Sequence, residues 1–245
     1  MKKLVMDNKK GSNVGLVVSF MIFVIFVLFV VTILQPVLNT NDDKKSLSLE
    51  IEKKIIEKTS DKLTTITISI KNPILPNCVS ISSFVSDFNV SSRIIIKSNS
   101  NETVSGSVSS LDSNILQINR ASTSDNFFKI YSGSGFDLLN SESLTCQSMI
   151  ENSDYKVGVV TREDYIFESK VISIMNSYLN YSLLKSDLGI PKSAEAEISF
   201  EFGNGTVINT GNATPTTNIF ADEKPVEYIS NSGDLTSGKI ITRIW

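Results

Sequence analysis

The pattern of apolar and polar residues is dominated by one uninterrupted apolar run near the start of the chain. It covers Val14 to Leu34, VGLVVSFMIFVIFVLFVVTIL, which is 21 residues without a charged side chain. At 1.5 Å per residue, a helix of this length extends about 30 Å, the thickness of a bilayer's hydrocarbon core. Helices buried in soluble proteins are rarely apolar on every face, so the run predicts a transmembrane helix over residues 12–36.

The charges on either side of the run predict its orientation. Four lysines lie within residues 1–11, whereas Asp42 and Asp43 follow the run. Lysines flanking a membrane helix are retained in the cytoplasm, so residues 1–11 are a basic cytoplasmic leader. The predicted location is therefore the cell membrane, crossed once, with the N-terminus cytoplasmic and the C-terminal domain extracellular.

A cleaved secretory signal is the alternative to a membrane anchor. The apolar region of such a signal usually has about 7–15 residues and ends at a small-x-small site. The run here is longer and ends in Leu34-Gln35-Pro36-Val37. We therefore expect the helix to remain in the membrane, with Pro36 kinking or ending it near the outer interface.

Beyond the proline, residues 37–60 predict a juxtamembrane amphipathic helix. Asp42 and Asp43 suit its first turn, and Leu47, Ile51 and Ile55 recur every four residues among charged neighbours. This apolar stripe could continue the membrane helix as an assembly face, or it could pack on the protein's own domain. The second interpretation is favoured, because the apolar stripe of an amphipathic helix usually contacts a core.

Residues 61–245 predict a β-rich exterior domain. Ile66, Ile68 and Ile70 alternate with Thr and Ser, which is the period of a strand with one buried face. Later apolar bursts are separated by Ser, Asn, Asp and Gly, which favour turns; they cover residues 94–96, 115–118, 127–130 and 157–160. The predicted fold class is α+β, in which a transmembrane helix with an amphipathic extension precedes a β-rich domain with one further amphipathic helix.

The further helix is predicted from a stripe of apolar residues. Ile172, Met175, Leu179 and Leu183 are spaced by three or four residues, the period of one helix face. The helix should end at residues 188–191, Leu-Gly-Ile-Pro, because glycine adopts the left-handed cap and proline cannot continue a helix.

The C-terminal end of the chain predicts two strand pairs. Alternating apolar residues over 198–202, a Gly-Asn-Gly turn at 203–205 and a return over 206–208 predict a hairpin. Residues 225–229 and 239–245 predict a second pair, in which the terminal Trp245 is tied into the sheet.

Composition removes several classes of chemistry. None of the 245 residues is histidine, which excludes Ser-His-Asp triads, HExxH zinc sites and histidine acid–base catalysis. The formal net charge of −3 argues against nucleic-acid binding, which needs a basic face. We predict no catalytic, cofactor-binding or metal-binding residues, and we do not expect an enzyme.

Several motifs predict local structure only. The GxG within residues 131–136 lacks the third glycine and the lysine of a phosphate loop, so it predicts a plain turn. The charged segments 162–164 and 221–224 also predict turns. Three glutamates with even spacing share one strand face, and a solvated face explains them better than a glycosidase acid pair: Glu195, Glu197 and Glu201.

Two kinds of covalent modification are predicted for the exterior domain. Cys78 and Cys146, the only cysteines, most often would form a disulfide outside the cell, with two free thiols as the alternative. Five Asn-x-Ser/Thr triplets follow the apolar run and are candidates for glycosylation: Asn89, Asn101, Asn180, Asn204 and Asn212. Asn204 and Asn212 fall in predicted turns and are the best of these candidates.

The junction before the apolar run resembles that of a known family. Lys9-Lys10-Gly11 is followed by Ser12 and then by the apolar residues, which is similar to the leader junction of type IV prepilins and their archaeal relatives. The resemblance implies that a prepilin-type peptidase cleaves between Gly11 and Ser12. Leu16 stands where many bacterial pilins have glutamate, and archaeal forms often lack that glutamate.

The order of elements adds to this resemblance. A basic leader, an apolar helix, an amphipathic continuation and a β-rich head look like a type IV pilin or pseudopilin. The resemblance implies a structural subunit whose partners are the lipid bilayer, copies of itself or other pilin-like subunits, and the peptidase. The alternative is a monomeric, membrane-tethered surface or binding protein that forms no filament.

Overall fold

The computed structural model of the chain describes residues 12–71, 77–109, 112, 114–120, 125–137, 146–211 and 219–245. For residues 12–13 and 34–41 it describes the backbone alone. The chain divides into two compact units, the first ending at Leu47 and the second covering Ser48–Trp245. The first unit contains an N-terminal apolar helix, and the second is a β-rich sheet domain, so the fold mixes α and β structure.

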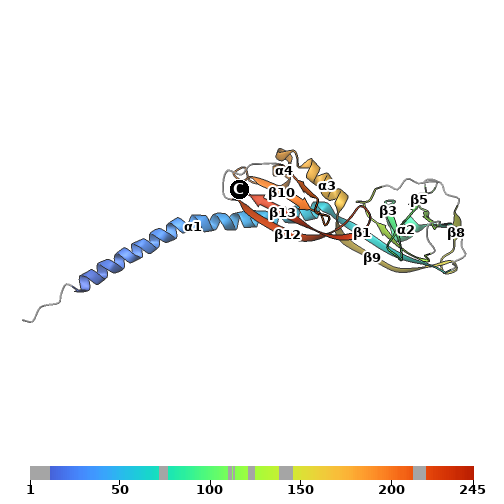
Figure 1. The fold of residues 1–245 in the computed structure, drawn as a ribbon, viewed down its shortest axis with the longest axis horizontal. Helices are drawn as coiled ribbons and strands as arrows, with labels where there is room; N and C mark the ends of the chain where they lie inside the picture. The colour runs from blue at the N-terminus through green and yellow to red at the C-terminus, as the bar shows by residue number, and fades with distance from the viewer. Residues whose placement is uncertain are drawn as a thin grey trace, which may run out of the picture. The chain divides into compact units, whose positions relative to one another are not determined.

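The helix α1 runs without interruption from Ser12 to Thr59 (Figure 1). It continues through Pro36, so the prediction that the helix could end there is wrong, as is the prediction that a new helix starts at Asp42 and Asp43. A proline removes one backbone hydrogen bond. Helix formation is cooperative, and strongly helical segments on both sides sustain the helix across that loss.

The last three turns of α1 belong to the sheet domain. Ile51 and Ile55 are fully buried there, as the predicted stripe requires. Lys53 and Glu57, on the opposite side, are exposed and form an ion pair of 3.8 Å. The expectation that this stripe packs on the protein's own domain is therefore confirmed for residues 48–59.

The domain is built on a nine-stranded sheet with the order β11-β10-β13-β12-β9-β1-β7-β3-β4. Adjacent strands are antiparallel, except that β12 meets β9 in parallel over two residue pairs. The strand bounds are β1 Ser60–Ile70, β3 Ile94–Ser98, β4 Thr103–Val104, β7 Phe127–Ser132, β9 Tyr155–Phe167, β10 Ala196–Glu201, β11 Val207–Asn209, β12 Phe220–Ile229 and β13 Leu235–Ile244. The strand predicted from Ile66, Ile68 and Ile70 is thus confirmed as β1, an interior strand of this sheet.

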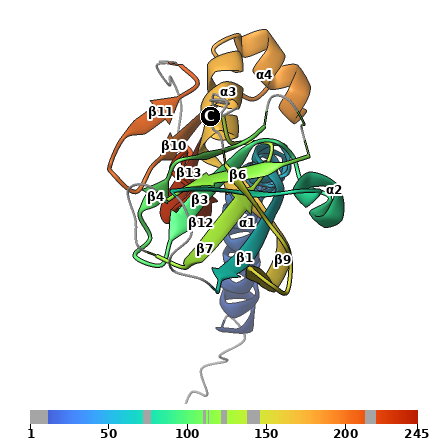
Figure 2. The ribbon, with the colours of Figure 1, turned by 90° about the vertical axis from the view of Figure 1, so that its right-hand side faces the viewer.

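A four-stranded sheet, of order β5-β6-β2-β8, covers one side of this framework. Its strands are β2 Cys78–Ile81, β5 Gly106–Val108, β6 Leu116–Asn119 and β8 Gln147–Met149, and the short helix α2 Phe84–Phe88 follows β2. In Figure 2, β1, β7 and β3 lie side by side, with β6 across them.

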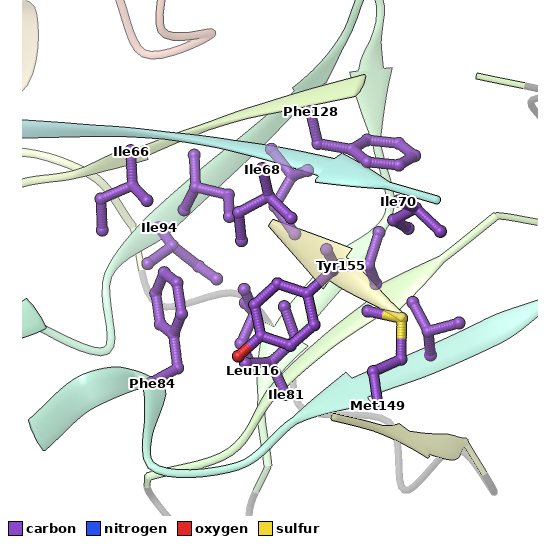
Figure 3. Close-up of a cluster of buried hydrophobic side chains, with 14 of the residues drawn as sticks. Ile66, Ile68, Ile70, Ile81, Phe84, Ile94, Leu116, Phe128, Met149 and Tyr155 are labelled. Atoms are coloured by element: carbon purple, nitrogen blue, oxygen red, sulfur yellow. The ribbon is translucent and has the colours of Figure 1, made fainter. Parts of the chain in front are cut away.

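One hydrophobic core of the domain lies between the two sheets (Figure 3). Ile66, Ile68 and Ile70 of β1 point into it and meet Ile81 and Phe84 from the other layer. All five side chains are buried. Burying each large apolar side chain stabilises the fold by about 1.5–3 kcal/mol, so this core accounts for the packing of the two sheets.

The region predicted as one helix forms two. Helix α3 covers Glu168–Ser177 and α4 covers Tyr181–Leu188. Both lie by the C-terminal strands in Figure 1. The break occurs where the Asn180 side-chain oxygen accepts a hydrogen bond from the Leu183 N–H at 3.4 Å, which caps the start of α4.

The break changes which residues face the core. Leu179 and Leu183, assigned to the predicted stripe, are 64% and 45% exposed, whereas Tyr178 and Leu184 are buried. The stripe is wrong beyond the break because α4 starts a new helical phase. The end of the helix is as predicted: Gly189 has φ of +70° and forms the left-handed cap.

The C-terminal strand pairs are confirmed. β10 and β11 form the predicted hairpin, and β12 pairs with β13 along its whole length. The Trp245 backbone exchanges two hydrogen bonds of 3.0 Å with Glu195, which ties the last residue into the sheet.

Two predicted charged turns are wrong. Residues 162–164 lie inside β9, and residues 221–224 lie inside β12. Along β12 the side chains alternate between exposed and half-buried. A run of charged residues is compatible with a strand when those side chains reach solvent, so charge alone did not mark the turns.

Candidate functional site

The apolar part of α1 is the first candidate. Its segment Val14–Ile33 is long and apolar enough to cross a membrane or to serve as a signal sequence. Its large apolar side chains are exposed, and the exposed fraction of most of them is 37–71%. The Thr32 hydroxyl donates to the carbonyls of Leu28 and Phe29, at 3.0 and 2.9 Å. Thr32 therefore satisfies its own polar group within the helix, and the segment offers an almost purely apolar surface.

The second candidate is a hollow of about 260 Å³ in the sheet domain. It lies on the face of β1 opposite the core between the two sheets, because its β1 residues alternate with the buried isoleucines. Three strands supply its floor and the β12–β13 turn supplies a wall. The lining residues are Leu63, Thr65 and Thr67 of β1, Lys129 and Tyr131 of β7, Thr161, Glu163 and Tyr165 of β9, and Ile229, Gly233 and Leu235.

Three residues that carry hydroxyl groups form a row across the floor of the hollow. Thr65 lies directly opposite Tyr131 on one side and Thr161 on the other in the strand register. Within the described residues, none of these three hydroxyls has a hydrogen-bond partner. Burial, followed by the negative charge of Asp234, raises the pKa of Tyr131, so its hydroxyl keeps its proton.

One acidic and one basic side chain lie beside this row. Glu163 accepts a hydrogen bond of 2.9 Å from the Tyr165 hydroxyl, and this bond is the main cause that raises the pKa of Tyr165. Lys129, directly opposite Thr67, is exposed. The hollow therefore contains one positive group, Lys129, and one negative group, Glu163, and the two charges cancel.

A β-bulge shapes the floor next to the row. The register between β1 and β9 shifts between Ile66 and Ile68. The Thr67 hydroxyl accepts the Val159 N–H at 2.7 Å and donates to the Val159 carbonyl at 3.2 Å, which satisfies the backbone at the irregularity. Bulges re-aim neighbouring side chains and are frequent beside binding sites.

The β12–β13 turn is anchored over the sheet by an ion pair. Lys97 of β3, whose side chain is 3% exposed, bonds the Asp234 carboxylate. The Asn101 amide donates to the same carboxylate at 3.1 Å. Lys97 is the main cause that lowers the pKa of Asp234. The wall of the hollow is thus held in place by contacts outside the hollow.

A small apolar cluster supports the same wall from below. It consists of Leu63, Ile95, Phe136, Phe167 and Ile229. The predicted turn around residues 133–136 is confirmed, and it belongs to this cluster: a side chain at Gly135 would collide with the Phe167 ring. The turn therefore has a packing role.

The predicted cysteine pair is confirmed as a disulfide. Cys78 and Cys146 are bonded, with their Cα atoms 4.6 Å apart. The bond joins the start of β2 to the residue before β8, the parallel neighbour of β2 in the four-stranded sheet. It lies outside the hollow.

Four of the five glycosylation candidates are exposed in the structure. Asn89, Asn101 and Asn180 are at the surface, and Asn204 lies in an exposed turn as predicted. Asn212 lies outside the described residues, as does Gly11 of the candidate cleavage junction. Ser12 is the first residue of α1.

The three glutamates with even spacing each contact a different cation: Glu195 with Lys185 at 2.7 Å, Glu197 with Arg243 at 3.4 Å, and Glu201 with Lys239 at 3.1 Å. Glu197 and Glu201 belong to β10, and Glu195 lies directly before it. In the described part of the chain, no three Asp, Glu or Cys residues are grouped so that they could hold a metal ion.

The hollow is not predictable from the sequence. In the sequence, the threonines of β1 indicate only the polar side of a half-buried strand, and Tyr131 stands beside a segment that predicts a plain turn. The alternation did indicate which β1 residues share a face, but pairing with β7 and β9 is set by the fold.

Comparison with known proteins adds no identity. No protein-family model, no curated protein and no solved structure matches this chain.

Proposed function

We propose that this protein is a pilin-like structural subunit, anchored in the cell membrane by Val14–Ile33 and displaying the sheet domain outside the cell. The observation that carries the proposal is the continuity of α1. One helix contains both the exposed apolar segment and the turns whose Ile51 and Ile55 are buried in the domain. A signal sequence that is removed would not need to be continuous with the core of the domain.

The exposed apolar segment needs a nonpolar environment. Exposed apolar surface of this size is rare on soluble proteins and marks membrane or protein contacts. In a bilayer, lipid or neighbouring helices would cover these side chains, and helices associate there through close packing. The lysines of residues 1–11 favour a cytoplasmic N-terminus, which leaves the domain outside. A disulfide in the domain agrees with that compartment.

The N-terminal sequence of the mature protein tests the family resemblance. We expect the purified wild-type protein to begin at Ser12. Gly11→Val should block cleavage and leave a protein that begins at Met1, whereas the control Gly15→Val, four residues later, should still begin at Ser12. A wild-type protein that begins at Met1 would argue against the pilin-like class.

Oxidative cross-linking tests assembly. The native cysteines are bonded to each other, so Ser19→Cys would place a single free thiol within the apolar segment. We expect disulfide-linked dimers in native membranes. The control Ser173→Cys, on the exposed surface of α3, should give far fewer. Equal, low yields from both variants would contradict assembly through the helix.

The hollow in the domain favours a second candidate function. A monomeric, membrane-tethered binding protein would use the same anchor and would need a binding site on the displayed domain. That candidate expects a protein that begins at Met1 and does not cross-link through Ser19→Cys.

A further inference from the structure

We propose that the hollow on the face of β1 is a binding site for a neutral oligosaccharide, with one sugar ring seated across Tyr131, Thr65 and Thr161. This inference goes beyond the proposed function, because it concerns the displayed domain and holds whether or not the subunits assemble. The chemistry of the lining residues and their register carry it.

The register arranges three hydroxyl-bearing residues as a row across three strands. Tyr131, Thr65 and Thr161 are direct cross-strand neighbours, and adjacent strands are about 4.8 Å apart. Each hydroxyl can both donate and accept a hydrogen bond, and none is used within the described residues. A sugar also presents hydroxyls that both donate and accept, so every pairing between the two sets can be satisfied.

The same surface offers apolar area for the other side of a sugar ring. Tyr131 and Tyr165, both half-buried, line the hollow together with Leu63 and Leu235. A sugar ring combines C–H groups with hydroxyls, and tyrosine likewise combines an apolar ring with a polar tip. Apolar walls with a few placed polar groups are the usual composition of a ligand site.

The charges of the hollow favour a neutral ligand. Lys129 and Glu163 lie two residues from Tyr131 and Thr161 on their strands, and therefore on the same face. Sites for phosphate or carboxylate groups concentrate cations, arginine above all, whereas this pair is balanced. Glu163 can accept a bond from one sugar hydroxyl, and Lys129 can donate to another.

The site is held open independently of any ligand. The Lys97–Asp234 ion pair and the packing of Gly233 on Ile95 fix the β12–β13 turn that forms the wall. Binding would therefore need little rearrangement, which lowers the entropic cost of ordering the site. The Thr67 hydroxyl is bonded to both the N–H and the carbonyl of Val159, and it therefore supports the floor of the hollow.

Binding to neutral trisaccharides tests the proposal. The full chain in lipid nanodiscs, free of detergents with sugar headgroups, would be mixed with cellotriose, maltotriose, mannotriose and chitotriose. Saturation-transfer NMR should show contact with at least one of them, with a dissociation constant on the order of 1 mM, since one ring in a half-open hollow makes few contacts.

Single substitutions locate the bound sugar. Tyr131→Phe, Thr65→Val and Thr161→Val each remove one hydroxyl and should weaken binding about tenfold, the effect of losing one hydrogen bond. Thr103→Val, on the exposed edge strand β4, is the matched control and should bind as wild type. Lys129→Met changes an exposed side chain and tests the site if a floor variant fails to fold.

Three outcomes would overturn the proposal. The first is the absence of saturation transfer from all four sugars. The second is wild-type affinity in the folded double variant Tyr131→Phe, Thr65→Val, which would place the sugar elsewhere. The third is stronger binding of a sulfated trisaccharide than of its neutral parent, which would make the site an anion site. None of these results bears on cleavage at Gly11 or on cross-linking of α1.

Discussion

The two faces of strand β1 share one backbone but differ in burial. On one face Ile66, Ile68 and Ile70 are buried against the four-stranded sheet. On the other face Thr65 and Thr67 line an open hollow that only the β12–β13 turn partly covers. A strand exposes its two faces to different surroundings, so the face that fills the core stabilises the fold while the other stays available for binding.

The two faces of β1 are recognised by different observations. The apolar face is recognised by burial, because Ile66, Ile68 and Ile70 are all shielded from solvent. The open face is recognised by unsatisfied polar groups, since the hydroxyls of Thr65, Tyr131 and Thr161 have no hydrogen-bond partner within the described residues. Changes to the first should alter stability, and changes to the second should alter binding with little effect on stability.

The largest effect should come from opening the disulfide that ties the layer over the apolar face. Cys78 and Cys146 are 68 residues apart, and in the chain-entropy model closing a loop of that length stabilises the fold by about 4 kcal/mol. We expect the double variant Cys78→Ser, Cys146→Ser to unfold at markedly lower urea concentration than the oxidised wild type. The reduced wild type is the matched control and should behave as the variant does.

Hydrogen exchange would show where that loss acts. Amides of the four-stranded sheet, such as those of Val79 and Ile118, should exchange faster in the variant, while those of β10 should change less. Uniform acceleration across both sheets would contradict the view that the disulfide secures one layer.

A core truncation should have the next largest effect. Ile68 is fully buried at the centre of the cluster in Figure 3. Ile68→Ala removes its packing and leaves a cavity, which we expect to cost about 3 kcal/mol in urea unfolding. Thr65→Ala, on the other face of the same strand, should cost less than about 0.5 kcal/mol. Similar losses for the two variants would erase the distinction between the faces.

The buried end of α1 contains a charged residue, Glu52, at a position that faces the core. Glu52 is buried, accepts a bond of 3.3 Å from Ser48 and lies 3.9 Å from Lys224. Burial, and then repulsion by Asp222, raises its pKa, although Lys224 and Ser48 act in the opposite direction. The folded state therefore binds the Glu52 proton more tightly than the unfolded state does.

The sign of the pH effect follows from that raised pKa. The cost of the buried charge is fully present above the folded-state pKa and disappears as the pH falls to the ordinary glutamate value. Glu52→Gln should stabilise the domain at pH 7, on the order of 1 kcal/mol, and should lose this advantage near pH 4. The exposed Glu57→Gln is the control. Destabilisation by Glu52→Gln at pH 7 would show that the contact with Lys224 outweighs burial.

Local patterns sufficed for much of this fold. The apolar run, the alternation of β1 and the C-terminal hairpins follow from side-chain periods that are visible in the sequence, and Gly189 was recognisable as a helix end. Pro36 and the charged segments 162–164 and 221–224 lead to wrong predictions, because each is a weak local signal that the surrounding helix or strand pairing overrides.

The hollow depended on information of another kind. Thr65, Tyr131 and Thr161 are neighbours because β1 pairs with both β7 and β9, and strand register is not written in any one of those segments. The break before α4 is similar, since it became clear only from the Asn180 cap. Long-range pairing, rather than local preference, assembled the candidate site.

The smallest effect should come from Asp61, at the start of β1. Its carboxylate accepts a bond of 2.7 Å from Lys170 and another from the Ser134 hydroxyl, and these bonds lower its pKa to about 2. A lowered pKa contributes stability above the ordinary aspartate value that is lost as the pH falls from about 4 to 2. Because the side chain is 38% exposed, solvent screens this contribution to less than about 1 kcal/mol.

Asp61→Asn should therefore be slightly less stable than wild type at pH 7 and equally stable near pH 2, as measured by urea unfolding. The control Asp164→Asn, exposed on β9, should match the stability of the wild type at both pH values. A difference that persists at pH 2 would mean that Asp61 acts through its shape rather than its charge.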